Sequence, residues 1–275
     1  MHQKPEQLYL DLMKKTLSFT LWPEPPLPIT TFYIRSPVKR FLVSAISKVL
    51  DKRKLLLVQK RDFSQSQRIE GRVWPVYADT MIGLKRLDNL QYCVETVLRE
   101  GVEGHLIETG AWRGGACIFM RAVLAAYGIA NRKVFVADSF EGLPKPDDRK
   151  YPADKGDKHH IHTYLAVSKE DVENNFRKYG LLDDQVVFLK GWFKDTLPNA
   201  PIEKLSILRL DGDMYGSTME SLEYLYPKLS NGGFCIIDDY ALRGCQMAVD
   251  DYRSKHQINS EMKEIDWTGR YWRKE

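Results

Sequence analysis

Pairs of aspartates close two apolar runs in the second half of this 275-residue sequence. Asp211 and Asp213 end the run LSILRLDGD, and Asp238 and Asp239 end GGFCIIDDY. If both runs are strands of one parallel sheet, their carboxyl ends meet at the edge where open α/β proteins bind ligands. Taken singly, each aspartate is more often a turn or capping residue. Four acids in one place repel unless a cation or a proton offsets them, and carboxylate oxygens suit a hard ion such as Mg²⁺.

A glycine-rich turn, ETGAWRGG at 108–115, follows an earlier apolar run. Its glycines let the backbone approach a ligand and present amides at the start of a helix. The spacing is not GxGxxG, which weakens a dinucleotide hypothesis, and a purely structural tight turn is almost as plausible. Asp138, at the end of the next apolar run, favours a ligand because an acid there can accept both ribose hydroxyls of a nucleoside.

Three histidines and two tryptophans are weaker candidates. His159, His160 and His162 match no zinc spacing, so we expect them in a solvated loop. Trp112 and Trp192 could stack on an adenine or a substrate, although burial in the core is equally plausible for each.

Five short apolar runs, separated by helical stretches, must position these residues. They cover 105–110, 133–138, 185–191, 205–213 and 232–240. This alternation predicts an α/β fold, a doubly wound parallel sheet with helices on both faces. EMKEID and GRYWRK flank a turn-like Trp-Thr-Gly and predict a C-terminal antiparallel hairpin on the sheet edge. The long polar span from Pro144 to His162 is typical of an exposed active-site loop.

Periodic apolar residues predict three helices before the first strand. One covers 6–19 and stops at the proline-rich WPEPPLP, and a second, over 41–50, is amphipathic and expected to pack on the domain. A third begins after Asp79, a plausible N-cap, and stops at Gly101. We expect residues 1–78 to form a helical lid that covers the substrate, and 79–275 to form the main domain.

The net charge of +4 is unevenly distributed, because residues 34–72 hold eleven Lys and Arg against three Asp and Glu. That segment lacks interleaved aromatics and a known binding motif, so we expect a solvated face or lid and no nucleic-acid partner. The four cysteines form no CxxC pair. The N-terminus has no apolar signal region, and no apolar run approaches about 18 residues. We expect a soluble cytoplasmic protein without stable membrane insertion, and a homo-oligomer.

Seven sequence words together carry a family resemblance. They are YLDLMKKTLSFTLW, MIGLKRLDNLQ, ETGAWRGGACIFM, DSFEGLPKP, GWFKDTLP, LRLDGDMYGSTMESLEYLYPKLSNGGF and IIDDY. Through them the chain resembles the macrocin O-methyltransferase family, which methylates sugar hydroxyls and related groups in antibiotic biosynthesis. The resemblance implies the Rossmann-like class I methyltransferase fold, S-adenosylmethionine at the first strand ends and Mg²⁺ held by aspartates at the later ones.

Carried over motif by motif, the resemblance makes Asp211, Asp238 and Asp239 metal ligands and Asp213 the general base. The cofactor-binding motifs contain Glu108, Gly110, Ala111, Trp112, Asp138, Ser139 and Trp192. The stretch from about Ser36 to Arg72 does not align with the family, and we expect it to cover the acceptor.

The expected reaction is methyl transfer to a hydroxyl of a sugar or glycosylated natural product, a small-molecule acceptor. One alternative is a metal-dependent methyltransferase of a phenolic or catechol hydroxyl, which an activity screen across both acceptor types would separate. Another is a non-catalytic S-adenosylmethionine-binding protein with purely structural aspartates. The coincidence of four aspartates at two strand ends argues against it.

Overall fold

Within residues 4–31 and 35–275, which the computed structural model describes, seven strands form one mixed sheet in the order β5-β4-β3-β6-β7-β9-β8. The strands are β3 (His105–Thr109), β4 (Val134–Asp138), β5 (Val186–Lys190), β6 (Leu205–Leu210), β7 (Leu229–Ile237), β8 (Lys263–Glu264) and β9 (Arg270–Arg273). β3 to β7 are parallel, and β9 pairs antiparallel with both β7 and β8. The predicted strands and the C-terminal hairpin are therefore confirmed.

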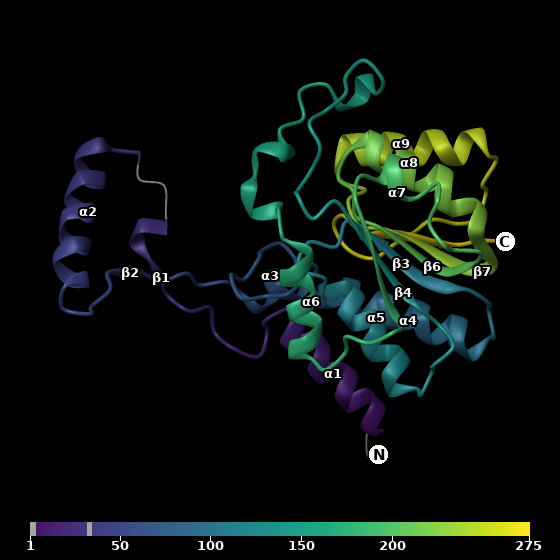
Figure 1. The fold of residues 1–275 in the computed structure, drawn as a ribbon, viewed down its shortest axis with the longest axis horizontal. Coiled ribbons are helices and arrows are strands. Elements are labelled where there is room, and N and C mark those ends of the chain that lie inside the picture. The colour runs from purple at the N-terminus through teal and green to yellow at the C-terminus, as the bar shows by residue number, and fades with distance from the viewer. Residues whose placement is uncertain (1–3, 32–34) are drawn as a thin grey trace.

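Helices cover both faces of this sheet because its central strands are apolar on both sides. Leu106 contributes to the core on one face, and its neighbour Ile107 to the core on the other. The first face carries α1 (Pro5–Leu17), α4 (Leu84–Arg99), α5 (Gly115–Ala126) and α6 (Lys169–Lys178). The second carries α7 (Phe193–Thr196), α8 (Tyr215–Leu225) and α9 (Arg243–Lys255), so that the sheet lies between two helical layers (Figure 1). This is the doubly wound arrangement that the sequence predicts.

Helix α4 begins later than the sequence predicts. Its N-cap is Gly83, and Asp79 lies four residues earlier, where its carboxylate accepts a hydrogen bond of 2.7 Å from the Tyr179 hydroxyl. The chain passes so close to α5 here that a Cβ on Gly115 would lie 2.4 Å from the Asp79 carbonyl oxygen. The predicted cap at Asp79 is therefore wrong, because tertiary packing holds residues 79–83 outside the helix.

Helix α2 (Pro37–Asp51) stands apart from the two layers (Figure 1). It is carried by a two-stranded ribbon of β1 (Leu27–Pro28) and β2 (Val58–Gln59), and we call β1, α2 and β2 the arm. No residue of α2 is buried, and Phe41 is 73% exposed. The prediction that this helix packs on its own domain is wrong. The short helix α3 (Gln65–Ile69) follows the arm and returns the chain to the domain.

Short 3-10 helices complete the described elements: η1 (Ile29–Thr31), η2 (Pro152–Asp154), η3 (His159–Ile161), η4 (Thr163–Leu165) and η5 (Tyr226–Lys228). Three of them, η2 to η4, lie in the long connection between β4 and α6. Among the described residues, no helix combines the length and the apolar character needed to cross a bilayer.

Candidate active site

A cavity of about 520 Å³ opens at the carboxyl ends of strands β3 to β7. Its lining includes all eleven residues that the sequence assigns to the cofactor, the metal or the base: Glu108, Gly110, Ala111, Trp112, Asp138, Ser139, Trp192, Asp211, Asp213, Asp238 and Asp239. They come together because parallel strands place their carboxyl ends at one edge of the sheet.

The glycine-rich turn after β3 allows its backbone to lie in close contact with the backbone that follows β6. Gly110 has a φ of +87°, and a Cβ there would lie 1.6 Å from the backbone oxygen of Asp211. The carboxylate of Asp138 holds the turn from the next strand, accepting hydrogen bonds from the backbone amides of Ala111 at 2.7 Å and Trp112 at 3.3 Å. Its other oxygen accepts from the Phe140 amide at 2.7 Å. Burial raises the pKa of Asp138, which these three N–H donors partly offset.

The two candidate stacking residues lie in the cavity wall and not in the core. Trp112 is half-buried, its indole N–H donates to the Tyr164 carbonyl at 3.0 Å, and the Arg113 guanidinium lies 4.2 Å from its ring centre. Trp192 is also half-buried and precedes α7 as its N-cap.

Three carboxylates form a compact group on the neighbouring strand ends. Asp211, Asp238 and Asp239 each offer an oxygen, and these three oxygens all lie within 4.8 Å of one another. The carboxylate of Asp239 also accepts a hydrogen bond of 3.2 Å from the backbone amide of Asp213, whose φ of 57° is unusual for a residue other than glycine. The donor set is oxygen only and concentrates negative charge, so it fits a hard divalent cation.

Burial perturbs the pKa of every acid in this group. It raises the pKa of Asp211 and of Asp239 well above their usual values, and the neighbouring carboxylates add to the rise. It raises the pKa of Asp213 to about 6, with His159 acting in the opposite direction. At Asp238 burial acts in the same upward direction, but two arginines outweigh it and the pKa falls below its usual value.

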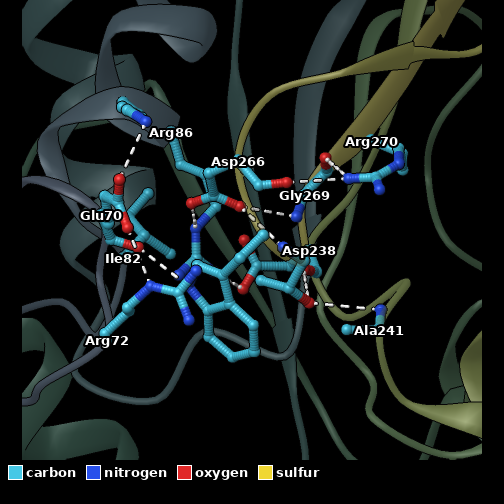
Figure 2. A network of polar contacts seen from close by, with 12 residues as sticks. Glu70, Arg72, Ile82, Arg86, Asp238, Ala241, Asp266, Gly269 and Arg270 are labelled. Carbon is cyan, nitrogen blue, oxygen red and sulfur yellow. Dashed lines mark hydrogen bonds and ion pairs between the residues drawn. The ribbon is translucent and has the colours of Figure 1, made fainter.

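Those arginines, Arg209 and Arg86, were not singled out from the sequence. Arg209, 1% exposed, pairs with Glu108 and Asp238 and lies 2.9 Å from a carboxylate oxygen of Asp211. Arg86 from α4 donates to the other oxygen of Asp238 at 2.5 Å and to Asp266 at 2.9 Å (Figure 2). Both oxygens of Asp238 are thus held by guanidinium groups, which fixes this carboxylate in place.

Glu108 lies deeper than a residue that simply touches a ligand. It is 2% exposed, one carboxylate oxygen pairs with Arg209, and the other accepts from the Cys117 thiol at 2.9 Å. Glu108 therefore links the glycine-rich turn to the arginine beneath the aspartates.

The polar loop after β4 also contributes to the site. The carboxylate of Asp154 is buried and accepts the backbone amides of Tyr215 at 2.7 Å and Gly216 at 2.9 Å, at the start of α8. His159 lines the cavity, and its Nδ1 lies 2.6 Å from the carboxylate of Asp157. His162 is exposed, as expected of a solvated loop. His159 lies in the loop after β4, as predicted, and its side chain, 37% exposed, also lines the cavity.

The family profile described as macrocin-O-methyltransferase (TylF) matches residues 6–274. The chain belongs to the macrocin O-methyltransferase family. It is 50% identical over 274 residues to the 8-demethyl-8-(2,3-dimethoxy-alpha-L-rhamnosyl)-tetracenomycin-C 4'-O-methyltransferase of Streptomyces olivaceus, covering 99% of this chain and 95% of that protein. It is 46% identical over 273 residues to the mycinamicin III 3''-O-methyltransferase of Micromonospora griseorubida, covering 98% and 96%.

Solved structures agree with this membership. The O-methyltransferase NovP superposes with a TM-score of 0.84 at 44% identity, over 98% of this chain and 99% of that one. The calicheamicin methyltransferase CalS11 shares the fold, with a TM-score of 0.57 at 18% identity over 99% and 94% of the two chains. The protein is thus an O-methyltransferase of the class I fold, and this enzyme class implies S-adenosylmethionine as the methyl donor.

Proposed function

We propose that this O-methyltransferase methylates a sugar hydroxyl of a glycosylated natural product, with Mg²⁺ held by aspartates and Asp213 as the general base. The observation that supports it most is the cavity in which the oxygen-only group Asp211, Asp238 and Asp239 lies next to Asp213 and the glycine-rich turn. We infer the acceptor class from three relatives, whose names give a rhamnosyl-tetracenomycin, mycinamicin III and demethyldecarbamoylnovobiocin as their substrates.

The cofactor would lie over the ends of β3, β4 and β5, against Gly110, Ala111, Trp112, Ser139 and Trp192. The sulfonium of S-adenosylmethionine supplies a methyl group that is already activated for transfer. Asp138 holds the turn amides in place, so its carboxylate acts at least as a positioning group beside its proposed contact with the ribose hydroxyls. Glu108 would support the same turn from below through Arg209.

The proposed metal ligands are Asp211, Asp238 and Asp239. Bound Mg²⁺ would supply Lewis acidity that lowers the pKa of an acceptor hydroxyl. The charge on the site favours this role, because burial and mutual repulsion raise the pKa of Asp211 and Asp239, and a cation would relieve both effects.

Asp213 would remove the acceptor proton as the methyl group is transferred. Its carboxylate lines the cavity two residues beyond Asp211, and its amide is fixed on Asp239 at 3.2 Å. A pKa raised to about 6 leaves it deprotonated at neutral pH and still basic enough to accept a proton. The loop anchored through Asp154 would help to exclude water during transfer.

We further propose that residues 1–78 cover the acceptor and that 79–275 form the catalytic domain, with α1 of the first segment packed against α4 and α5 of that domain. Gly71 and Trp74 support the first role because they line the cavity. We also propose a reducing, cytoplasmic environment, since all four cysteines are buried free thiols.

We propose a homo-oligomer, and the surface of the arm supports this proposal. It presents exposed apolar side chains, among them Phe41 and Val49, and residues 34–72 carry an excess of +8 while the remaining chain carries −4. A second copy of this chain offers the complementary charge.

Sedimentation of the wild-type protein and of a Phe41→Ser, Val49→Ser variant tests whether the arm forms an oligomer interface. We expect the wild type to form a dimer or a larger assembly, and we expect the double substitution to dissociate it. A monomeric wild type that instead binds anionic vesicles would contradict it.

The function itself is tested with methyl-labelled S-adenosylmethionine and a panel of deoxysugar glycosides and catechols. We expect label in a glycoside, loss of transfer in excess chelator and recovery with Mg²⁺. Transfer only to catechols would favour the alternative acceptor, and cofactor binding without transfer to any acceptor would favour a non-catalytic protein.

A further inference from the structure

Two exposed tryptophans line the cavity without a place in the cofactor or metal site. Trp74 is 51% exposed and Trp267 is 42% exposed, and both contribute to the cavity wall. Single exposed apolar residues are normal on a protein surface, but two indoles lining one concave site are typical of ligand binding.

The order of the sheet places Trp267 on the side away from the cofactor residues. These follow β3, β4 and β5, the aspartates follow β6 and β7, and Trp267 lies in the turn just before β9, which pairs with β7. The methyl group must pass from the cofactor to an oxygen held at the aspartates. If the proposed metal site holds that oxygen, an acceptor that extends away from the cofactor residues would extend toward β9, where Trp267 lies.

The turn that carries Trp267 is held rigidly. The buried carboxylate of Asp266 accepts the backbone amides of Thr268 at 3.0 Å and Gly269 at 2.7 Å, and it also binds Arg86 (Figure 2). The Thr268 hydroxyl donates to the backbone oxygen of Asp238 at 3.0 Å. Because Arg86 and Thr268 both connect to Asp238, the turn keeps a fixed position relative to the proposed metal ligands.

The indole of Trp267 is itself oriented by residues next to the other tryptophan. Its N–H donates to the Glu70 carbonyl at 2.9 Å, and the Arg72 guanidinium lies 5.2 Å from its ring centre. Arg72 is in turn held by the Glu70 carboxylate at 2.8 Å (Figure 2). The C-terminal hairpin and the segment that leads to Trp74 thus form one wall of the cavity.

From this placement we infer that Trp267, together with Trp74, forms the surface that binds the acceptor. A fixed aromatic ring gives a large contact area at little loss of side-chain entropy. The surface fits an acceptor with a flat or C–H-rich face next to vicinal oxygens, as on a deoxysugar ring or its attached aromatic group. The inference rests on the proposed function and specifies which residues select its substrate.

The test measures steady-state kinetics of Trp267→Ala, Trp267→Phe and Trp74→Ala with an acceptor that the wild type methylates. We expect Trp267→Ala to raise the acceptor KM roughly 10- to 100-fold, with kcat within about threefold and Trp267→Phe in between. Calorimetry on the protein saturated with S-adenosylhomocysteine and Mg²⁺ should give the same fold-change in acceptor Kd. The Kd of S-adenosylhomocysteine alone should not change.

Trp22→Ala is the matched control, because Trp22 is 46% exposed and is not part of the cavity lining. An unchanged acceptor KM and Kd in the Trp267 and Trp74 variants would overturn the inference, as would an equal effect of Trp22→Ala. If Trp267→Ala fails to fold, the Phe and Trp74 variants decide. A wild type that methylates no acceptor overturns the proposed function, and the inference with it. An active wild type whose acceptor KM and Kd are unchanged in the Trp267 and Trp74 variants overturns the inference alone.

Discussion

Replacing Arg209 with methionine should destabilise the protein more than most single substitutions, because this guanidinium lies among buried acids. Its side chain pairs with Glu108, Asp211 and Asp238, and only 2% of the side-chain surface is exposed. Methionine keeps the length of the side chain and removes the charge. The three carboxylates would then face one another. Among the described residues, Arg86 would be the remaining guanidinium partner, and it binds Asp238 alone of the three.

The magnitude follows from the loss of one partner in a buried ion pair, which typically costs about 3–5 kcal/mol. For a domain of roughly 150–250 residues, each kcal/mol lowers Tm by roughly 2–4 °C. We therefore expect Arg209→Met to lower Tm by roughly 6–20 °C. Added Mg²⁺ should recover part of this loss, since a cation bound only by the folded state stabilises it by mass action.

Thermal unfolding followed by circular dichroism, with and without Mg²⁺, measures both effects. Arg121→Met is the matched control: Arg121 is also a buried arginine, but its partner Asp183 is 42% exposed, so we expect a loss of about 1 kcal/mol or less. Equal Tm values for wild type and Arg209→Met, or equal losses in both variants, would refute the role of Arg209 as counter-ion of the acid cluster.

Three further substitutions test the rest of the site. Asp138→Ala removes the acceptor of two turn amides, so calorimetry should show S-adenosylmethionine binding weakened roughly ten- to a hundredfold; unchanged affinity would contradict the assignment. Gly110→Ala should abolish cofactor binding because its Cβ would lie 1.6 Å from the Asp211 backbone oxygen; normal binding would show that the turn can move. Asp154→Ala should speed hydrogen exchange in the loop after β4, and unchanged exchange would mean that other contacts hold it.

The strand ends were predictable because central parallel strands are continuous apolar runs, and their ends are marked by a change in residue type. β6 stops at Leu210 and β7 at Ile237, so Asp211 and Asp238 come directly after the strands, as the sequence suggests. Parallel pairing then brings these residues to one edge without further information. The aspartates and the glycine-rich turn follow from the same rule.

The partners of those residues were not predictable. Arg209 lies within an apolar run, and nothing local indicates that it bonds an acid within β3, the acid that follows β7 and the acid that follows its own strand. Arg86 and Trp267 are separated by 181 positions in the sequence. They come near each other only in the folded chain, where Arg86 donates to the carboxylate of Asp266, the residue before Trp267. Amphipathicity showed that α2 has an apolar face but not what covers it, so the expectation that it packs on its own domain was wrong.

The division of roles between Asp213 and the metal ligands is tested most directly by single-turnover methyl transfer against Mg²⁺ concentration. The variants are Asp213→Asn and Asp239→Asn; Asp239 is preferred to Asp238 because the latter also pairs with two arginines. We predict that Asp213→Asn lowers the chemical step by about 10²- to 10⁴-fold at every Mg²⁺ concentration, because the amide cannot take the proton. Asp239→Asn should recover as Mg²⁺ rises, since a neutral oxygen still coordinates at lower affinity. Rescue of Asp213→Asn but not of Asp239→Asn would exchange the two roles, and wild-type rates in both would contradict the proposed mechanism.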